Sequence, residues 1–123
     1  LAVSIIIALI GIANTLSLSI HERTRELGLL RAMGMTRPQL RSSVRWEAVI
    51  VALMGTAIGI GLGLGLSYTM VQVLESKGIN QFDIDPTFLV IVVLGGAALG
   101  VIASVRPSFK ASKLNVLEAI STE

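Results

Sequence analysis

Residues 48–74 read AVIVALMGTAIGIGLGLGLSYTMVQVL and contain no Asp, Glu, Lys or Arg. This run exceeds the roughly 20 apolar residues that an α-helix needs to cross the hydrocarbon core of a bilayer. A soluble domain of 123 residues has too small a core to bury a segment of this length. The stretch therefore predicts a transmembrane helix.

Two further runs, at residues 1–20 and 87–105, also lack charged side chains. Only 15% of the chain is charged, against roughly 25% in an average soluble domain, and the charges gather between the apolar runs. This distribution excludes a disordered chain, and the lack of cysteine excludes a disulfide-stapled one. It predicts an all-α integral membrane helical bundle with three transmembrane helices, at about residues 1–20, 47–74 and 87–105.

The charges between the predicted spans set an orientation. The segment 21–45 holds six arginines against two glutamates, and the tail 106–123 begins with Arg106, Lys110 and Lys113. The connection 75–86 is acidic instead, with Lys77 as its one basic residue. Because Lys and Arg concentrate in cytoplasmic loops, we expect segment 21–45 and the tail in the cytoplasm. The connection 75–86 and the N-terminal end are then expected outside a plasma or inner membrane.

The segment 21–45 carries signals for a helix, a turn and a second helix. Residues 22–33 show helical spacing of apolar side chains, so we expect the first span to continue as a helix beyond the lipid surface until Gly34 breaks it. Thr36-Arg37-Pro38-Gln39 matches a capping box and is expected to start the next helix. The positive-inside rule does not require apolar side chains between the arginines, so Leu27, Leu29, Leu30 and Met33 favour contact with a cytoplasmic partner.

Three other signals concern helix ends and charge. Asp85-Pro86 is expected to open the third span as an N-cap followed by proline, and Arg106-Pro107 is expected to end it. Arg37, Arg41 and Arg45 form a stripe at four-residue spacing. The stripe is compatible with lipid headgroups and equally with a protein partner.

Small residues recur at four-residue spacing within two spans. In lipid, such spacing lets two helix backbones approach closely, within one chain or between two chains. A phosphate-binding loop is excluded because no G-K-[ST] sequence closes the glycine run. The predicted helix-packing residues are Gly55, Gly59, Gly63, Gly96 and Gly100.

The sequence shows no catalytic or metal-binding constellation. His21 is the single histidine, and Arg25 stands where a second zinc-binding histidine would be needed. Asp83 and Asp85 are compatible with a cation site, but a solvated turn explains them as well. We therefore predict no catalytic residue, no metal and no cofactor, and no nucleic-acid partner.

Residues 20–34, IHERTRELGLLRAMG, resemble the E-R-x-x-E-[IL]-G-x-x-[RK]-A-x-G signature of FtsX-like permeases. Residues 106–120 resemble the closing motif of the same family, R-A-A-[RK]-[LI]-[DN]-P-[LV]-E-A-[LI]. Here Ser112 replaces an alanine of that motif and Val116 its proline. The family includes MacB-type exporters and lipoprotein-release permeases.

The resemblance implies a part of a four-span permease, of which these would be the last three spans. The start at Leu1 within apolar sequence agrees with a longer polypeptide. Family membership implies two paired permease protomers, each touching a separate ABC ATP-binding subunit through the first cytoplasmic loop. The implied contact residues are Glu22, Arg23, Arg25, Glu26, Leu27, Gly28, Leu30, Arg31, Ala32, Gly34 and Arg37.

The function expected from the resemblance is that of an ABC transporter permease subunit. It would couple ATP hydrolysis elsewhere to export or to mechanical work on an extracytoplasmic domain, and would not itself be an enzyme. The alternative is a non-transport helical membrane scaffold whose basic cytoplasmic loop binds lipid.

Overall fold

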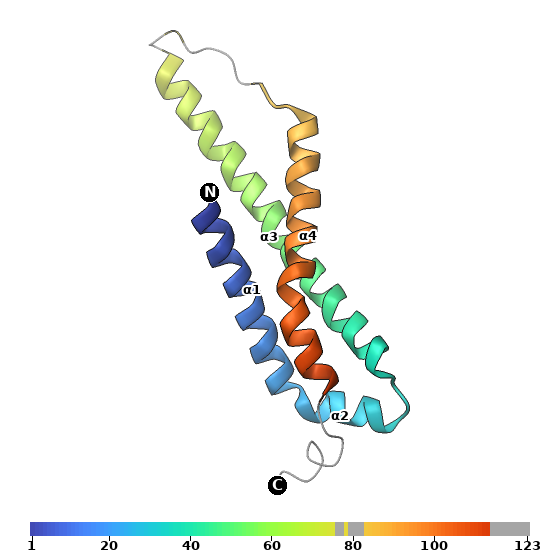
Figure 1. Ribbon diagram of the computed structural model, residues 1–123. Coiled ribbons are helices and arrows are strands. Elements are labelled where there is room, and N and C mark those ends of the chain that lie inside the picture. The colour runs from blue at the N-terminus through green and yellow to red at the C-terminus, as the bar shows by residue number, and fades with distance from the viewer. Residues whose placement is uncertain (76–77, 79–82, 114–123) are drawn as a thin grey trace.

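A computed structural model of the chain describes residues 1–75, 78 and 83–113. These residues form four helices: α1 (Ala2–Glu22), α2 (Thr24–Ala32), α3 (Arg37–Leu74) and α4 (Pro86–Ser112). In the lower half of Figure 1, α4 lies between α1 and α3, and α2 runs across the end of the bundle. The all-helical fold predicted from the sequence is confirmed for the described residues.

Three of these helices, α1, α3 and α4, are long and apolar enough to cross a membrane. Most of their large apolar side chains are exposed, including Ile7, Leu62 and Ile91. Water-soluble proteins rarely expose continuous apolar surface on this scale, whereas lipid tails cover it at no cost. The chain is therefore a multi-pass membrane protein. The predicted number of spanning helices is confirmed by length and composition.

Helices α3 and α4 pack through small side chains at four-residue spacing. A Cβ added at Gly100 would lie 2.7 Å from the Ala52 Cβ and 3.0 Å from the Ala48 carbonyl oxygen, and one added at Gly96 would meet Thr56. Dispersion contacts between closely spaced backbones therefore hold the two helices together. We call this contact the α3–α4 seam. Ala48, Ala52 and Thr56 on α3 meet Gly96 and Gly100 on α4, and the buried Val44, Ser104 and Ser108 continue the same rows at four-residue spacing.

Serines extend the α4 side of the seam toward α2 without leaving polar groups unpaired. The buried hydroxyls of Ser104 and Ser108 donate to the carbonyl oxygens of Val101 and Val105, at 2.7 and 3.0 Å. Because each hydroxyl bonds within its own helix, it needs no polar partner on α3. Serine thus acts at these positions as a small residue that still satisfies its hydrogen bonding.

The expected end of α4 at Arg106-Pro107 is wrong. The helix continues through Pro107 to Ser112. A proline inside a helix costs about 3 kcal/mol, because it removes one backbone hydrogen bond and crowds the preceding turn. Here Pro107, Ala111 and Ser112 are all buried against the rest of the bundle. The packing of this last turn offsets the cost of the proline, and a local sequence signal cannot report that packing.

The expected continuation of the first span into residues 22–33 is also wrong. Helix α1 stops at Glu22, and Arg23 (φ −100°, ψ 16°) separates it from α2, which turns across the bundle (Figure 1). The Thr24 hydroxyl donates to the carbonyl oxygens of Ile20 and His21, at 3.0 and 2.9 Å, and so satisfies groups that the break leaves open. The turn carries the apolar face of α2 onto the ends of α3 and α4, where it is buried.

The predicted turn and caps are confirmed. Gly34 has φ +107°, a conformation that other residues rarely adopt, and it follows the end of α2. Thr36 and Gln39 form both hydrogen bonds of the capping box at the start of α3. The Asp85 carboxylate accepts a hydrogen bond from the Thr87 amide at 2.9 Å and caps α4.

The seam predicts opposite effects for two glycine substitutions in α4. Gly100→Ala is expected to lower the free energy of unfolding by about 1–3 kcal/mol, since the added methyl overlaps α3 backbone that cannot move aside. Gly95→Ala is the matched control, because a Cβ there meets nothing within 4 Å. Replacing a helical glycine by alanine in open space is expected to stabilise by about 0.5–1 kcal/mol. Unfolding of each variant in detergent measures both effects, and equal stabilities would contradict the seam.

Candidate functional site

The end of the bundle that α2 covers holds a cluster of buried apolar side chains. We call this region the α2 end. Helices α1, α2, α3 and α4 all contribute, so this core ties them into one unit. Its buried members are Ile20, Leu27, Leu40, Val44 and Ala111, and Leu30 and Met35 pack against them.

Polar contacts fix the last turn of α4 to both α2 and α3. Arg31 Nη1 of α2 donates to the Ser112 carbonyl oxygen at 3.3 Å, and Arg41 Nε of α3 donates to the Ser112 hydroxyl at 3.0 Å. The Arg41 guanidinium carbon also lies 4.0 Å from the centre of the Phe109 ring, which is a cation–π contact. These contacts join α2 to the last turn of α4, and that turn to α3.

The acidic side chains of the α2 end lie near α1. The Ser19 hydroxyl donates to Glu47 Oε1 at 3.2 Å, and Arg23 forms an ion pair with Glu26 at 3.0 Å. The hydrogen bond and charge of Glu26, with a smaller effect from Glu47, raise the pKa of the exposed Arg23 guanidinium. The Arg23–Glu26 pair is solvent-exposed, so its main effect is to orient the two side chains rather than to stabilise the fold.

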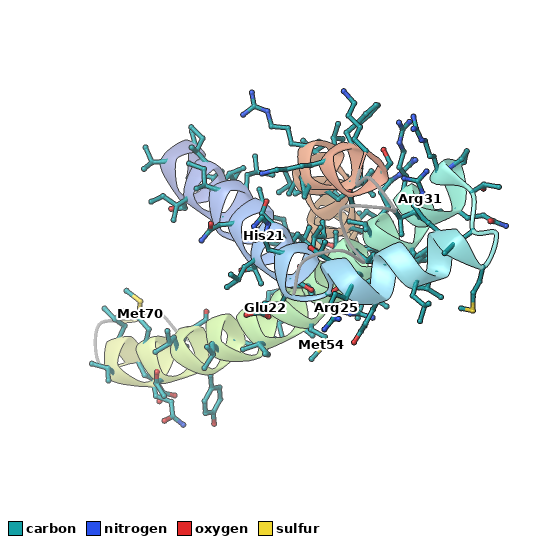
Figure 2. The ribbon with its side chains drawn as sticks, turned by 90° about the horizontal axis from the view of Figure 1, so that it is seen from below. His21, Glu22, Arg25, Arg31, Met54 and Met70 are labelled. Atoms are coloured by element: carbon teal, nitrogen blue, oxygen red, sulfur yellow. The ribbon has the colours of Figure 1, made fainter. Side chains whose placement is uncertain are left out.

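Helix α2 has two different faces. Leu27 is buried, and Arg31 reaches toward α4, whereas Arg25 lies on the side turned away from α4 (Figure 2). On the outward face, Leu29 and Met33 are 56% and 71% exposed beside Arg25 and charged neighbours. An outward face that mixes apolar and charged side chains is typical of a surface that contacts another protein.

The structure divides the eleven loop residues singled out in the sequence. Leu27 and Gly28 are buried and hold α2 against the bundle, so they cannot touch a partner directly. Leu30 and Arg31 are partly buried. The exposed residues of the set are Glu22, Arg23, Arg25, Glu26, Ala32, Gly34 and Arg37.

Two exposed residues, Leu29 and Met33, are not among the eleven contact residues that the resemblance implies, although the sequence marks them as apolar residues that favour a partner. They are four residues apart and follow Glu26 at helical spacing. The resemblance drew attention to signature positions instead, and several of those positions serve the internal packing of α2.

The predicted helix-packing glycines also fall into two groups. Gly96 and Gly100 face α3 across the seam. At Gly55, Gly59 and Gly63 an added Cβ would meet nothing within 4 Å, so these three make no close contact within the described part of the chain. Gly59 and Gly63 instead line an open apolar groove of about 870 Å³ where α3 and α4 diverge (Figure 1). Packing at these three positions stays a prediction about another helix.

The family of the chain follows from the order of these elements and from its sequence. The model of the FtsX-like permease C-terminal domain matches residues 1–116, which include all three spanning helices and α2. The chain belongs to the FtsX-like permease family. The resemblance found at residues 20–34 is thereby confirmed.

Curated relatives of this FtsX-like chain are named as transport proteins. The chain is 31% identical to the ABC transporter permease YtrF of Bacillus subtilis over 98% of its own length and 30% of that protein. It is 32% and 35% identical to the macrolide export ATP-binding/permease proteins MacB of Chromobacterium violaceum and Bdellovibrio bacteriovorus. These two matches cover 98% and 99% of this chain, and 18% of each MacB protein. The chain thus spans less than a third of the relatives it matches.

Among residues 1–75, 78 and 83–113, no group of three or more His, Asp or Glu could hold a metal ion. Asp85 is engaged as the cap of α4. The closing family motif at residues 114–120 lies outside the described residues.

The contacts of Arg41 predict a specific loss on substitution by lysine. Arg41→Lys removes the Nε donor to Ser112 and the flat guanidinium over Phe109, and is expected to lower the free energy of unfolding by about 1–2 kcal/mol. Arg45→Lys, at an exposed position one turn along α3, keeps the charge and is expected to change stability by less than about 0.5 kcal/mol. Denaturation in detergent compares the two, and equal losses would contradict a fixed Arg41.

Proposed function

We propose that the chain is the membrane domain of an ABC transporter permease subunit. In this proposal it couples ATP hydrolysis by a nucleotide-binding subunit to export or to mechanical work on an extracytoplasmic domain. Membership of the FtsX-like family supports it, as do relatives named as ABC transporter permeases. Names that combine ATP-binding with permease, as in the MacB relatives, support an ATP-binding partner.

The outward face of α2 is the observation that carries the proposal. Leu29 and Met33 are exposed among charged side chains, while Leu27 anchors the opposite face in the core. Exposed apolar side chains on a firmly held helix favour docking of a protein surface rather than plain solvent exposure. The proposed contact surface for the ATP-binding subunit is Glu22, Arg23, Arg25, Glu26, Leu29, Ala32, Met33, Gly34 and Arg37.

The connections of α2 to the spans support a coupling role. Leu27 packs with Leu40 of α3 and Ala111 of α4, and Arg31 bonds the end of α4. From Arg37 the helix α3 runs without interruption to Leu74, about 57 Å at 1.5 Å per residue. A push on α2 would therefore displace the whole of α3 as a rigid rod.

Orientation and assembly belong to the same proposal. The α2 end carries the basic residues, and by the positive-inside rule this supports a cytoplasmic location for it and an outer location for the opposite end. A second permease protomer is proposed as the partner of the glycine face at Gly55, Gly59 and Gly63, where close helix approach is possible.

Charge insertion on the outward face of α2 tests the ATPase contact. Leu29→Asp and Met33→Asp each place a carboxylate where the partner would bury an apolar group, and are expected to reduce permease-stimulated ATPase activity about tenfold or more. Both positions are exposed, so membrane insertion and stability should stay unchanged. Ser42→Asp, which adds the same charge at an exposed position on α3, is the matched control and should retain stimulation.

Two results would contradict the proposed contact. One is full stimulation in both α2 variants, and the other is equal loss in the Ser42→Asp control. Arg31 is a poor site for this test, because it also holds Ser112 and its substitution would disturb the fold. Purification of the tagged protein separates the proposal from the scaffold alternative. Recovery of an ATP-binding protein in fixed stoichiometry with the wild type, and its loss from the Leu29→Asp variant, would contradict the scaffold alternative.

A further inference from the structure

Arg41 has unused hydrogen-bond donors although its side chain is fixed in place. Nε is bound to Ser112, and the guanidinium lies over Phe109. Among the described residues, its terminal Nη groups donate no hydrogen bond. A guanidinium presents two parallel N–H groups that match the oxygens of a phosphate, and here it is already oriented before any ligand arrives.

Other cations flank this position along both helices. Arg37 and Arg45 lie about one turn before and after Arg41 on the same face of α3, and both are exposed. Arg106 and Lys113 lie about one turn either side of Phe109 on α4, and are likewise exposed. Because Arg41 rests on Phe109, the two rows follow one line between the helices. We call these five residues the basic seam: Arg37, Arg41, Arg45, Arg106 and Lys113.

The acidic residues described at the α2 end are engaged or placed elsewhere. Glu47 accepts a hydrogen bond from Ser19 on α1, and Glu26 pairs with Arg23. Glu22 is exposed at the last residue of α1. Among the described residues, the positive charge of the basic seam is therefore not neutralised by an ion pair.

The central part of the basic seam, around Arg45, Arg106 and the Arg41 guanidinium, lies at the depth of lipid headgroups. The uncharged run of α3 begins at residue 48 and that of α4 ends at residue 105, so Arg45 and Arg106 stand just beyond the hydrocarbon. At 1.5 Å per residue, the backbone of Arg41 lies about 10 Å beyond the end of its run, but its guanidinium rests on Phe109, which lies about 6 Å beyond the end of the run in α4. The headgroup layer is about 5–8 Å thick on each side. Exposed Trp46 at this level agrees with an interfacial position.

We propose that the basic seam binds the phosphate of an anionic glycerophospholipid headgroup, with the Arg41 Nη groups as direct ligands. Arg37, Arg45, Arg106 and Lys113 attract the net negative headgroup and disfavour zwitterionic lipids, because their positive charges repel the ammonium group of such a lipid. The site goes beyond the proposed ATPase coupling and does not depend on it, since its direct ligand Arg41 and its neighbours Arg45, Arg106 and Lys113 lie outside the proposed ATPase contact, and Arg37 is the one residue that the two surfaces share. A bound lipid would bridge α3 and α4 next to the Arg41–Ser112 hydrogen bond.

Lipid binding to the purified full-length protein tests this site. The shift of its thermal unfolding midpoint in detergent is measured with added phosphatidylglycerol and with phosphatidylcholine, since a ligand of the native state raises that midpoint. Phosphatidylglycerol is expected to bind about tenfold more tightly than phosphatidylcholine. Arg41→Gln is expected to abolish this preference, and the exposed variants Arg45→Gln and Arg106→Gln to reduce it about threefold each.

Controls separate the proposed site from general charge and from soluble anions. Arg25→Gln removes the same charge from the face of α2 turned away from α4, and should keep the full lipid preference. Equal binding of the two lipids by the wild type would overturn the proposal. So would an equal effect of Arg25→Gln, or competition by inorganic phosphate as strong as that of the lipid. If Arg41→Gln does not fold, Arg45→Gln and Arg106→Gln decide the matter.

Discussion

The close approach of α3 to α4 is the contact on which the rest of the bundle depends. Apolar helices gain nothing by leaving lipid for one another, so their association requires many short-range dispersion contacts. Gly100 supplies them by bringing the two backbones to a distance that leaves no room for a methyl group. The serines at 104 and 108 continue the contact and return their hydrogen bonds to their own helix. Only with this pair in place do the last turns of α4 offer a surface for α2.

The α2 end follows a different physical rule. Its side chains lie beyond the uncharged runs, where water covers exposed surfaces and burial of apolar area is favourable. Leu27, Leu40 and Ala111 therefore form a compact core of the kind found in soluble proteins. The protein thus uses dispersion between small residues in the lipid and hydrophobic burial outside it. The change between the two occurs near Val44, which belongs to both contacts.

Much of the fold could be predicted from the sequence because charge is so unevenly placed along it. The spans, the capping box at Thr36 and the turn at Gly34 are local signals that tertiary packing did not override. Two local predictions failed for the same reason. The break at Arg23 has no glycine or proline to mark it, and the helix through Pro107 ignores a strong breaking signal. In both cases burial at the α2 end decides, and this information lies in residues far away along the chain. The exposed face of α2 could likewise be predicted only in part, because the family signature includes buried residues such as Leu27 as well as exposed ones.

The limited extent of the α3–α4 seam has a geometric consequence for the opposite end of the bundle. The two helices diverge beyond Thr56, so the remainder of α3 up to Leu74 extends from the seam as an arm of about 27 Å. Each degree of rotation of this arm about the end of the seam would move its far end by about 0.5 Å. The α3–α4 seam, which is built from small residues, is therefore the place about which the outer part of α3 would rotate.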